Sequence, residues 1–357
     1  MKTSSENPVF GDAAFAAHEQ VVFAHDAAAG LKAIIAVHNT TLGRALGGTR
    51  MWAYDTEVDA LRDVLRLAQG MTFKNALAGV PFGGGKAVII GDAAHDKSPE
   101  LFRAMGRAID RLDGWFVTGE DVGISVADAE EMRKTTTHVR GIAEGGAGDP
   151  SPTTAYGVFK GMEAAAQHRF GVATLKDQRV CVQGLGAVGM MLCKLLHGAG
   201  AQLLVADIRN QAVREAGERF GATAVLPDKA HAADCDIFAP CALGAGLNAR
   251  TIRQIRARVV AGSANNQLAR TVDGARLSEY GILYAPDYVI NAGGVISIAH
   301  EGPNFDCEAM LAHVARIGDT LQQIFASAER DNLPTSLVAD RMAQECIAAA
   351  YEENQAA

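Results

Sequence analysis

The chain has 357 residues, enough for about two domains of ordinary size. Its 33 Lys and Arg face 41 Asp and Glu, which gives a formal net charge of −8, and there is no run of like charge. Nucleic-acid-binding proteins usually carry a basic face, so we expect small-molecule partners and no nucleic acid.

The composition also argues against export, membrane insertion and metal binding. Residues 1–8 lack the apolar core of a secretory signal, and no apolar run approaches the roughly 18 residues that span a bilayer. The six cysteines include no Cys-x-x-Cys pair, and none of the ten histidines has metal-ligand spacing. We therefore expect a soluble, cytoplasmic protein with no membrane partner and no metal site.

The first half of the chain predicts mixed helices and strands. Apolar runs at 21–24 and 31–37 indicate a hairpin. Thr56 and Asp59 form a capping box that begins a helix, on or just beyond whose last turn Lys74 lies. The remaining predictions are a glycine-rich strand or loop at 42–50, strands at 88–90 and 115–118, and helices that begin after Ser98 and Ser125.

The second half predicts a doubly wound parallel sheet. A glycine- and proline-rich stretch at 141–152 marks a domain boundary. Beyond it, a strand at 179–183, a helix through Leu196 and a strand at 202–206 form a βαβ unit. Further alternation, with apolar strands at 235–240, 259–261 and 282–285 and helical periodicity in the C-terminal tail, extends this α/β pattern.

Two lysines, Lys74 and Lys86, lie among glycine and apolar residues. Composition alone favours two solvated surface lysines, but an exposed loop rarely carries neighbours such as Phe73 and Phe82, so we expect a half-buried cleft. Burial and a second cation both lower the pKa of a lysine, which can then act as a base. Residues 83–86 are not part of a nucleotide phosphate loop, because Val80 stands where that motif requires its first glycine and Ala87 where it requires serine or threonine.

The motif Gly184, Gly186 and Gly189 follows a predicted strand and opens a predicted helix, and Asp207 ends the next strand. This context is typical of a dinucleotide site, in which glycines admit a pyrophosphate and a carboxylate binds the ribose diol. The alternative is a packing turn with a solvated aspartate. A carboxylate repels a 2′-phosphate, so NAD is favoured over NADP, although Arg209 nearby leaves NADP open.

Three further segments stay ambiguous on the residues alone. Asp121 follows an apolar strand and suits either a general acid/base or a turn aspartate. The amide-rich segment 263–267 and the segment 287–294, which contains Asn291, suit either a ligand site at the carboxyl end of a sheet or simple turns.

Together these motifs resemble the Glu/Leu/Phe/Val amino-acid dehydrogenase superfamily, and within it most of all the leucine dehydrogenases. The resemblance implies an α/β substrate domain, residues 1–144 with a C-terminal helix at about 335–357, and a Rossmann-type NAD-binding domain, residues 145–334. It also implies chemistry between the domains and a homo-oligomer. The similar segments are 46–50, 70–75, 83–86, 120–123, 150–157, 183–189, 239–242, 263–267 and 286–294.

The resemblance implies reversible, NAD-dependent oxidative deamination of an apolar L-amino acid to a 2-oxo acid and ammonia. Lys74 would pair with the substrate carboxylate, Lys86 would activate the attacking water, and Asp121 would shuttle a proton at the amino group. The implied cofactor-binding residues are Thr154, Gly184, Gly186, Ala187, Val188, Gly189, Asp207, Ala242, Asn266 and Asn291.

Substrate specificity also follows from the resemblance. Leu46 stands where glutamate dehydrogenases typically carry a lysine, which favours an apolar side chain, leucine above all. Gly119 stands where leucine enzymes tend to have alanine and phenylalanine enzymes glycine, so a phenylalanine dehydrogenase is the alternative. Arg140 replaces an expected small polar residue without explanation. The implied substrate-binding residues are Leu46, Gly47, Met71, Lys74, Gly119, Asn266, Val295 and Ile298.

Two other functions compete with this one. A catalytically silent NAD-binding regulator is possible, but Lys74, Lys86 and Asp121 are all present and argue against it. A 2-hydroxy-acid dehydrogenase normally needs a catalytic histidine paired with a carboxylate, and the sequence contains no convincing motif of that kind.

Overall fold

The computed structural model describes residues 9–142, 148–242 and 244–356. The chain forms two compact α/β units. Unit 1 contains Met1–Asp149, Ile298–Phe305 and Glu345–Ala357, and unit 2 contains Pro150–Ser297 and Asp306–Gln344. The boundary placed from the sequence between residues 144 and 145 lies outside the described residues.

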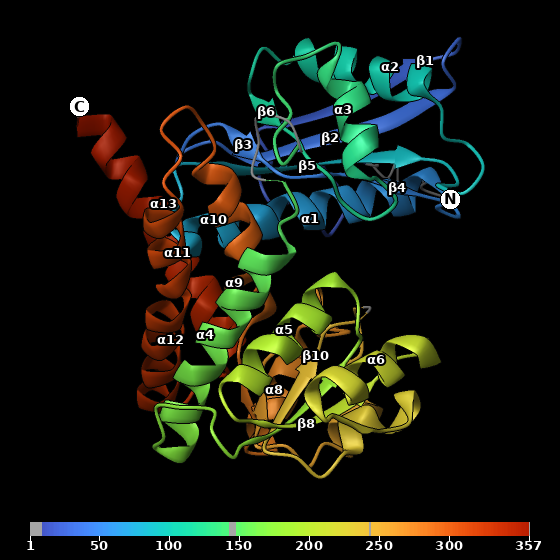
Figure 1. Ribbon diagram of the computed structural model, residues 1–357. Coiled ribbons are helices and arrows are strands. Elements are labelled where there is room, and N and C mark those ends of the chain that lie inside the picture. Colours follow the sequence, from blue (N-terminus) through green and yellow to red (C-terminus); the bar gives the residue numbers. More distant parts are fainter. Residues whose placement is uncertain (1–8, 143–147, 243, 357) are drawn as a thin grey trace, which may run out of the picture. The chain divides into compact units, whose positions relative to one another are not determined.

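Unit 1 is built on a six-stranded sheet (Figure 1). The strand order is β1-β2-β5-β3-β6, with β4 also paired to β5. The predicted hairpin is confirmed, because β1 and β2 pair antiparallel with Gln20 opposite Val37. The strands are β1 (Gln20–Asp26), β2 (Leu31–Asn39), β3 (Ala45–Leu46), β4 (Thr49–Trp52), β5 (Gly83–Ile90) and β6 (Phe116–Val117).

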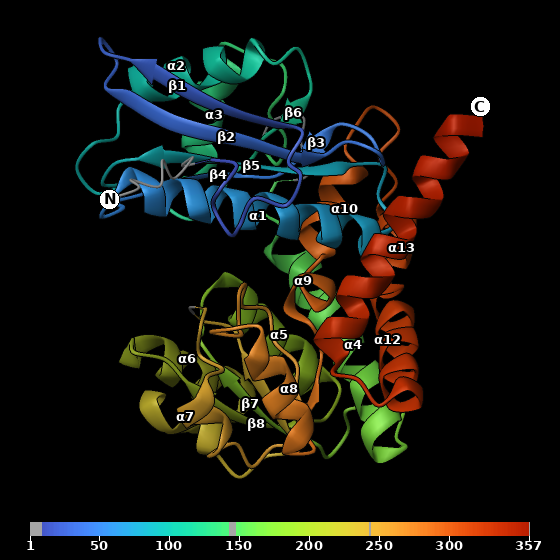
Figure 2. The ribbon, with the colours of Figure 1, turned by 180° about the vertical axis from the view of Figure 1, so that it is seen from behind.

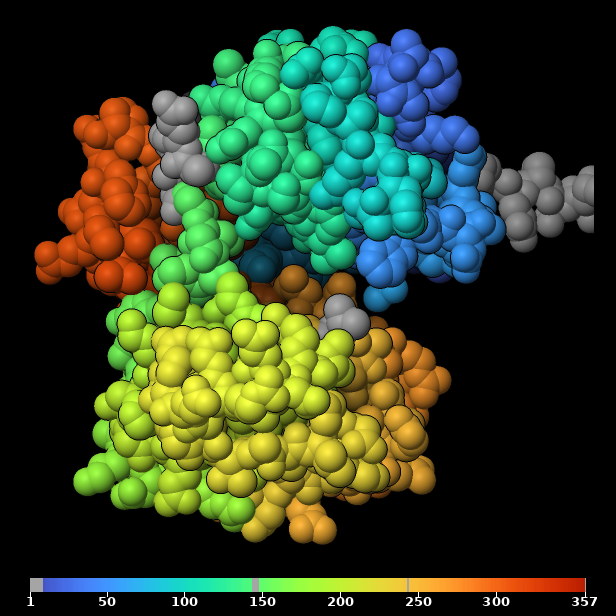
Figure 3. All heavy atoms as spheres, turned by 45° about the vertical axis from the view of Figure 1, so that its right-hand side comes forward, coloured from blue at the N-terminus to red at the C-terminus, as the bar shows by residue number. Residues whose placement is uncertain are grey.

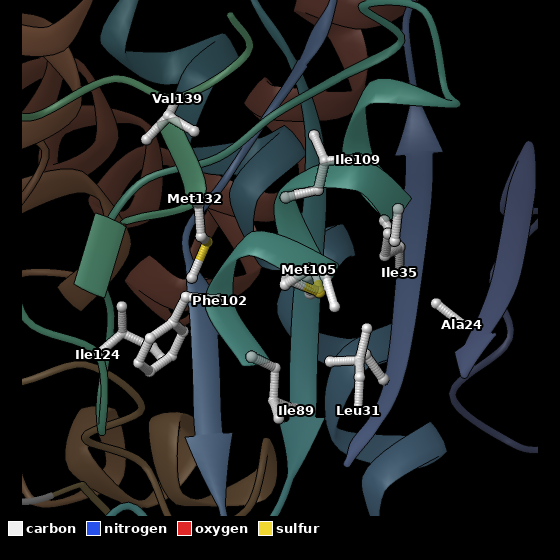
Figure 4. Close-up of a cluster of buried hydrophobic side chains, with 14 of the residues drawn as sticks. Ala24, Leu31, Ile35, Ile89, Phe102, Met105, Ile109, Ile124, Met132 and Val139 are labelled. Carbon is white, nitrogen blue, oxygen red and sulfur yellow. The ribbon is translucent and has the colours of Figure 1, made fainter. Parts of the chain in front are cut away.

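Helices cover both faces of this sheet. Helix α1 (Glu57–Ala78) lies on one face, and α2 (Pro99–Asp110) and α3 (Val126–Arg133) lie on the other (Figures 1 and 2). All three predicted caps are confirmed: Thr56, Ser98 and Ser125 each accept a hydrogen bond from the main chain three residues on. The core beneath α2 and α3 includes Ile35, Ile89, Phe102, Met105 and Met132 (Figure 4).

Strand β5 begins five residues earlier than the strand predicted at 88–90, so Lys86 lies within a central strand. The reason is the close packing of α1. A Cβ placed on Gly84 would lie 2.1 Å from the main-chain nitrogen of Thr72, so only glycine allows the helix main chain to touch the strand here. Glycine runs weaken the usual strand signal, which explains the early boundary.

Unit 2 contains the predicted parallel sheet. Its strand order is β12-β11-β10-β7-β8-β9, and every neighbouring pair is parallel. Numbered from β7 as the first strand, this is the order 6-5-4-1-2-3 of a dinucleotide-binding sheet. The short β9 was not predicted. The strands are β7 (Arg179–Gln183), β8 (Gln202–Ala206), β9 (Thr223–Ala224), β10 (Ile237–Pro240), β11 (Val259–Val260) and β12 (Leu283–Tyr284).

Helices pack around the unit 2 sheet (Figure 1). In the space-filling view, residues coloured green-yellow to yellow form much of the visible surface of this unit (Figure 3). Helices α10 (Gly293–Ala299) and α13 (Thr335–Ala356) each contribute residues to both units. None of the helices in the described part of the chain is both long and apolar enough to cross a membrane. The other helices of unit 2 are α4 (Ser151–Phe170), α5 (Ala187–Gly198), α6 (Asn210–Phe220), η1 (Pro227–Ala232), α7 (Ala249–Ile252), α8 (Val272–Glu279), α9 (Asp287–Ile290), α11 (Cys307–Ala315) and α12 (Ile317–Asp331).

Candidate active site

A buried ion pair joins two of the predicted residues in unit 1. Lys86 comes from the middle of β5, and Asp121 from the loop that follows β6. Lys86 Nζ lies 3.2 Å from Asp121 Oδ2, and the two side chains are only 6% and 14% exposed. Charges so poorly solvated interact more strongly than charges at a surface.

A second cation, Arg50, binds the same carboxylate. Arg50 Nε donates to Asp121 Oδ2 at 2.9 Å, and another guanidinium nitrogen donates to Asp63 Oδ2, also at 2.9 Å. Tyr54 donates its hydroxyl to Asp63 at 2.7 Å. The network therefore alternates cation and carboxylate, so each buried charge has an opposite neighbour.

This network lowers the pKa values of both Lys86 and Asp121, for different physical reasons. Burial lowers the pKa of Lys86; Asp121 opposes that effect, and Arg50 adds to it. Burial by itself would raise the pKa of Asp121, but Lys86 and Arg50 outweigh it and the pKa is lowered. Asp121 is therefore ionised at neutral pH, while Lys86 gives up its proton more readily than a surface lysine.

Two glycines let the main chain between β3 and β4 lie directly against this ion pair. A Cβ on Gly47 would lie 1.8 Å from the carbonyl oxygen of Gly85, next to Lys86. A Cβ on Gly48 would lie 2.9 Å from Asp121 Cβ. Larger residues at these positions would push the main chain away from the two charged groups.

One face of α1 points toward the same region. Met71 packs against Gly47, since its Cγ would lie 3.1 Å from a Cβ placed there. Asn75 donates its amide to the carbonyl oxygens of Gly83 at 2.6 Å and Leu46 at 3.4 Å. Residues three apart are neighbours on the surface of a helix, so the half-buried Lys74 lies next to Met71 on α1.

In unit 2, the three motif glycines have three different environments. Gly184 has a φ of +99°, and a Cβ on it would lie 2.8 Å from the nitrogen of Ala242. A Cβ on Gly189 would lie 1.9 Å from the oxygen of Gly184. A Cβ on Gly186 would meet nothing within 4 Å, so this glycine borders open space at the start of α5. A tight turn, an open approach and close helix–strand packing are what a pyrophosphate site requires.

Asp207 is held at the end of β8. Its Oδ2 accepts from the main-chain nitrogen of Leu185 at 2.7 Å, and its Oδ1 accepts from the main-chain nitrogen of Arg209 at 2.8 Å. Burial would raise the pKa of Asp207, but these hydrogen bonds and the Arg209 charge lower it. The carboxylate is therefore ionised and fixed beside the glycine motif.

Ala242, Asn266 and Asn291 follow the parallel strands β10, β11 and β12 along the chain, and Thr154 lies in the first turn of α4. Ala242 packs against Gly184 between β7 and β10, where the strand order of the sheet reverses direction. Asn291 donates to the carbonyl oxygen of Ser263 at 3.1 Å and to Asn265 Oδ1 at 2.7 Å, which joins the two ambiguous segments. Asn266 is exposed and has a φ of +51°. Thr154 Oγ1 would lie 3.2 Å from a Cβ placed on Gly294.

Comparison with known proteins identifies the family. Residues 17–138 match the family Glu/Leu/Phe/Val dehydrogenase, dimerisation domain. Residues 145–217 and 205–353 match the family Glutamate/Leucine/Phenylalanine/Valine dehydrogenase. The chain belongs to the Glu/Leu/Phe/Val dehydrogenase family.

Individual relatives match nearly the whole chain. The leucine dehydrogenase of Geobacillus stearothermophilus is 53% identical over 332 residues, 92% of this chain and 90% of that protein. The valine dehydrogenase of Streptomyces albus is 48% identical over 340 residues, 93% of each chain. The crystal structure of the L-tryptophan dehydrogenase from Nostoc punctiforme has a TM-score of 0.81 and 44% identity, covering 94% of this chain and 97% of that one.

These matches confirm the predicted family, its resemblance to leucine dehydrogenases and the two-domain α/β fold. As a Glu/Leu/Phe/Val dehydrogenase, the chain is an amino-acid dehydrogenase that uses a nicotinamide cofactor. The residues present fit that cofactor, because Gly186 borders open space at a helix N-terminus and Asp207 presents a fixed carboxylate.

Within this Glu/Leu/Phe/Val dehydrogenase, the predicted residues fall into two groups. Unit 1 holds Leu46, Gly47, Met71, Lys74, Lys86, Gly119, Asp121 and Ile298. Unit 2 holds Val295 and the predicted cofactor residues, Asn266 among them. Sequence reasoning missed Arg50, Tyr54 and Asp63; the available signal was that Arg50 ends the Gly-Gly-Thr-Arg motif.

Proposed function

We propose that the chain catalyses reversible, NAD-dependent oxidative deamination of apolar L-amino acids, with leucine as the preferred substrate. The observation that carries the proposal is the buried pair of Lys86 and Asp121, 3.2 Å apart, with Arg50 on the same carboxylate. A lysine of lowered pKa and an ionised carboxylate at hydrogen-bonding distance are the two proton-transfer groups that this reaction needs.

The surroundings of the pair support an amino acid as the substrate. Lys74 lies next to Met71 on α1 and supplies a cation for the substrate carboxylate. Leu46, buried in β3, supplies no charge, so a glutamate side chain would leave its carboxylate without a partner there. Gly119 and Ile298, both in unit 1, complete the proposed side-chain pocket, and Val295 stays a predicted substrate-binding residue.

The chemistry divides between cofactor and protein. When bound, the nicotinamide ring accepts a hydride from the α-carbon of the amino acid. Asp121 takes a proton from the substrate amino group, and Lys86 removes a proton from the water that attacks the resulting imine. Arg50 keeps Asp121 ionised and oriented through its 2.9 Å hydrogen bond. In the reverse direction the same groups return these protons.

NAD is proposed over NADP because of Asp207. Its carboxylate is held by Leu185 and Arg209, and its pKa is lowered, so it carries a negative charge where the adenosine ribose would bind. A ribose diol can donate to this carboxylate, whereas a 2′-phosphate would be repelled. Thr154, Ala242, Asn266 and Asn291 complete the proposed cofactor site.

Steady-state NADH formation tests the proposal, with leucine, isoleucine, valine, phenylalanine and glutamate as substrates and NADP as the competing cofactor. We expect kcat/KM to be highest for leucine and lowest for glutamate. Turnover of glutamate alone would contradict the pocket assignment. Reduction of 2-oxo acids without ammonia would instead indicate a 2-hydroxy-acid dehydrogenase.

Phenylalanine dehydrogenase is the second candidate, because Gly119 presents no side chain to the proposed pocket. A higher kcat/KM for phenylalanine than for leucine would select it. Lys86→Ala separates both enzymes from a silent NAD-binding regulator: we expect turnover to vanish while NAD binding, measured by calorimetry, persists. Tight NAD binding by the native chain without turnover of any amino acid would favour the regulator.

We also propose that the substrate domain comprises residues 1–144 with the C-terminal helix, that residues 145–334 bind the cofactor, and that the protein is a homo-oligomer. The match of residues 17–138 to a dimerisation domain supports the last point. Sedimentation velocity measures it directly, and a purely monomeric protein at assay concentration would contradict it. The cytoplasmic location stays a prediction.

A further inference from the structure

Arg140, which the sequence left unexplained, lies against Gly119 through its main chain. The main-chain nitrogen of Arg140 donates to the carbonyl oxygen of Thr118 at 2.8 Å. A Cβ placed on Gly119 would lie 3.0 Å from the carbonyl oxygen of Arg140. The two segments therefore run side by side, and Arg140 forms one boundary of the space next to Gly119.

The side chain of Arg140 reaches a segment far along the chain. Its guanidinium donates to the carbonyl oxygen of Ile298 at 3.1 Å, across a sequence separation of 158 residues. The Cζ atom also lies 5.5 Å from the centre of the Phe82 ring, where a cation is attracted to the aromatic face. Arg140 thus holds Ile298 from one side and is itself held by the residue that precedes β5.

A second hydrogen bond joins the same two segments, and here the side chain belongs to the other segment. The carboxylate of Glu301 accepts from the main-chain nitrogen of Gly141 at 2.9 Å. Gly141 has a φ of +69°, and a Cβ on it would lie 3.5 Å from Ile298 Cδ1. Each segment therefore supplies one side chain to the main chain of the other, and together they fix the position of Ile298.

We propose that Arg140 is a specificity-determining positioning residue that holds the main chain of Ile298 at a set distance from Gly119 and thereby limits the size of the amino-acid side chain. The inference rests on the proposed function, in which Gly119 and Ile298 line the side-chain pocket. Arg140 makes no hydrogen bond or ion pair to Lys86 or Asp121 among the contacts of the described residues, so it acts on substrate choice and not on proton transfer.

The test is substrate discrimination in Arg140→Met, which keeps a long apolar stem but removes every donor. Without the hydrogen bond, the main chain of Ile298 can move away from Gly119 and the side-chain pocket can widen. We therefore expect kcat/KM for phenylalanine relative to leucine to rise about five-fold or more. Arg140→Lys keeps a cation near Phe82 and one donor, so its ratio should change less. Arg111→Met, which removes an exposed arginine of the same unit, is the matched control and should leave the ratio unchanged.

A second variant keeps the test decisive if Arg140→Met does not fold. Glu301→Ala removes the acceptor for Gly141 and should shift the ratio in the same direction, whereas Glu301→Gln retains an acceptor oxygen and should restore it. The pH at which kcat reaches half its maximum reports the Lys86 and Asp121 pair, so this pH should be the same in all five variants as in the native chain. A purely structural role for Arg140 would not change the phenylalanine-to-leucine ratio of kcat/KM while leaving the pH midpoint of kcat in place.

Three outcomes overturn the inference. An unchanged ratio in Arg140→Met and Glu301→Ala, with the native chain active on amino acids, refutes it and leaves the proposed function standing. A shifted pH midpoint with an unchanged ratio assigns Arg140 to proton transfer instead. No turnover of any amino acid by the native chain refutes the proposed function, and the inference falls with it.

Discussion

Replacing Asp121 with asparagine removes one negative charge from the buried network and preserves the size of the side chain. Lys86 Nζ lies 3.2 Å from the carboxylate oxygen that this change neutralises. At an effective dielectric constant of about 20, two unit charges at that separation attract each other by about 5 kcal/mol. This attraction helps Lys86 to keep its proton. Burial and Arg50 then lower the pKa of Lys86 against only the weaker opposing charge of Asp63, so this pKa falls further.

Two consequences with different readouts follow. The rate should fall by about 10²–10⁴, the usual contribution of a positioned acid or base, because asparagine cannot accept the proton of the amino group. The activity that remains should rise at lower pH than in the native enzyme. A base works only after losing its own proton, and Lys86 loses it more readily once Asp121 is neutral.

The assay is the pH dependence of kcat/KM for leucine, followed by NADH absorbance. Arg50→Gln is the matched control, because it removes a positive charge from the same carboxylate. Arg50 contributes to lowering the pKa of Lys86, so its loss should move the acidic limb to higher pH, opposite to Asp121→Asn. An upward shift in Asp121→Asn, or a rate close to that of the native enzyme, would refute the reasoning.

Three further predictions concern the cofactor site and stability. Gly186→Ala should weaken NAD binding at least ten-fold yet leave Tm nearly unchanged, because its Cβ meets nothing within 4 Å. Gly189→Ala should lower Tm by several degrees, because its Cβ would lie 1.9 Å from the carbonyl oxygen of Gly184. Equal losses of NAD affinity by calorimetry and equal Tm values for the two variants would contradict this. Asp207→Asn keeps an acceptor for Leu185 but loses the charge, so NAD affinity should fall about 10–100-fold while NADP improves relative to it, and an unchanged NAD/NADP ratio would argue against the ribose role. Burial, with His18 nearby, lowers the pKa of His38 to about 4. Because the unfolded state binds this proton near its usual value, the stabilising contribution is present at neutral pH and is lost as pH falls from about 6.5 toward 4. Urea unfolding should show a loss of about 2 kcal/mol between pH 7 and pH 5 that His38→Gln, which can still hydrogen-bond Thr72, does not show; an equal slope in both proteins would exclude His38 as its source.

Local features of the sequence were sufficient wherever a structure is decided by neighbouring residues. The helix starts at Thr56, Ser98 and Ser125 follow from a side chain that accepts a main-chain hydrogen bond three residues on. The βαβ unit around Gly184, Gly186 and Gly189 follows from the spacing of its glycines. Each of these depends on fewer than about ten consecutive residues, within which backbone and cap geometry act directly.

The early start of β5 shows where local signals fail. Gly83, Gly84 and Gly85 carry no side chains to indicate a strand, and they belong to one because α1 approaches them closely at Thr72. The requirement for glycine thus comes from a helix that lies earlier in the chain. Such a contact is recorded only in the folded structure.

The same limit applies to the candidate site. The sequence by itself was sufficient to indicate a Glu/Leu/Phe/Val dehydrogenase, and it led to the prediction that Lys86 and Asp121 are the catalytic residues. Only the tertiary structure decided that Arg50 and Asp63 complete their network, and that Arg140 reaches Ile298 from 158 positions away. Ion pairs and main-chain hydrogen bonds act over about 3 Å in space whatever the separation in sequence, so no spacing of residue types could have indicated which distant partner each arginine would bind.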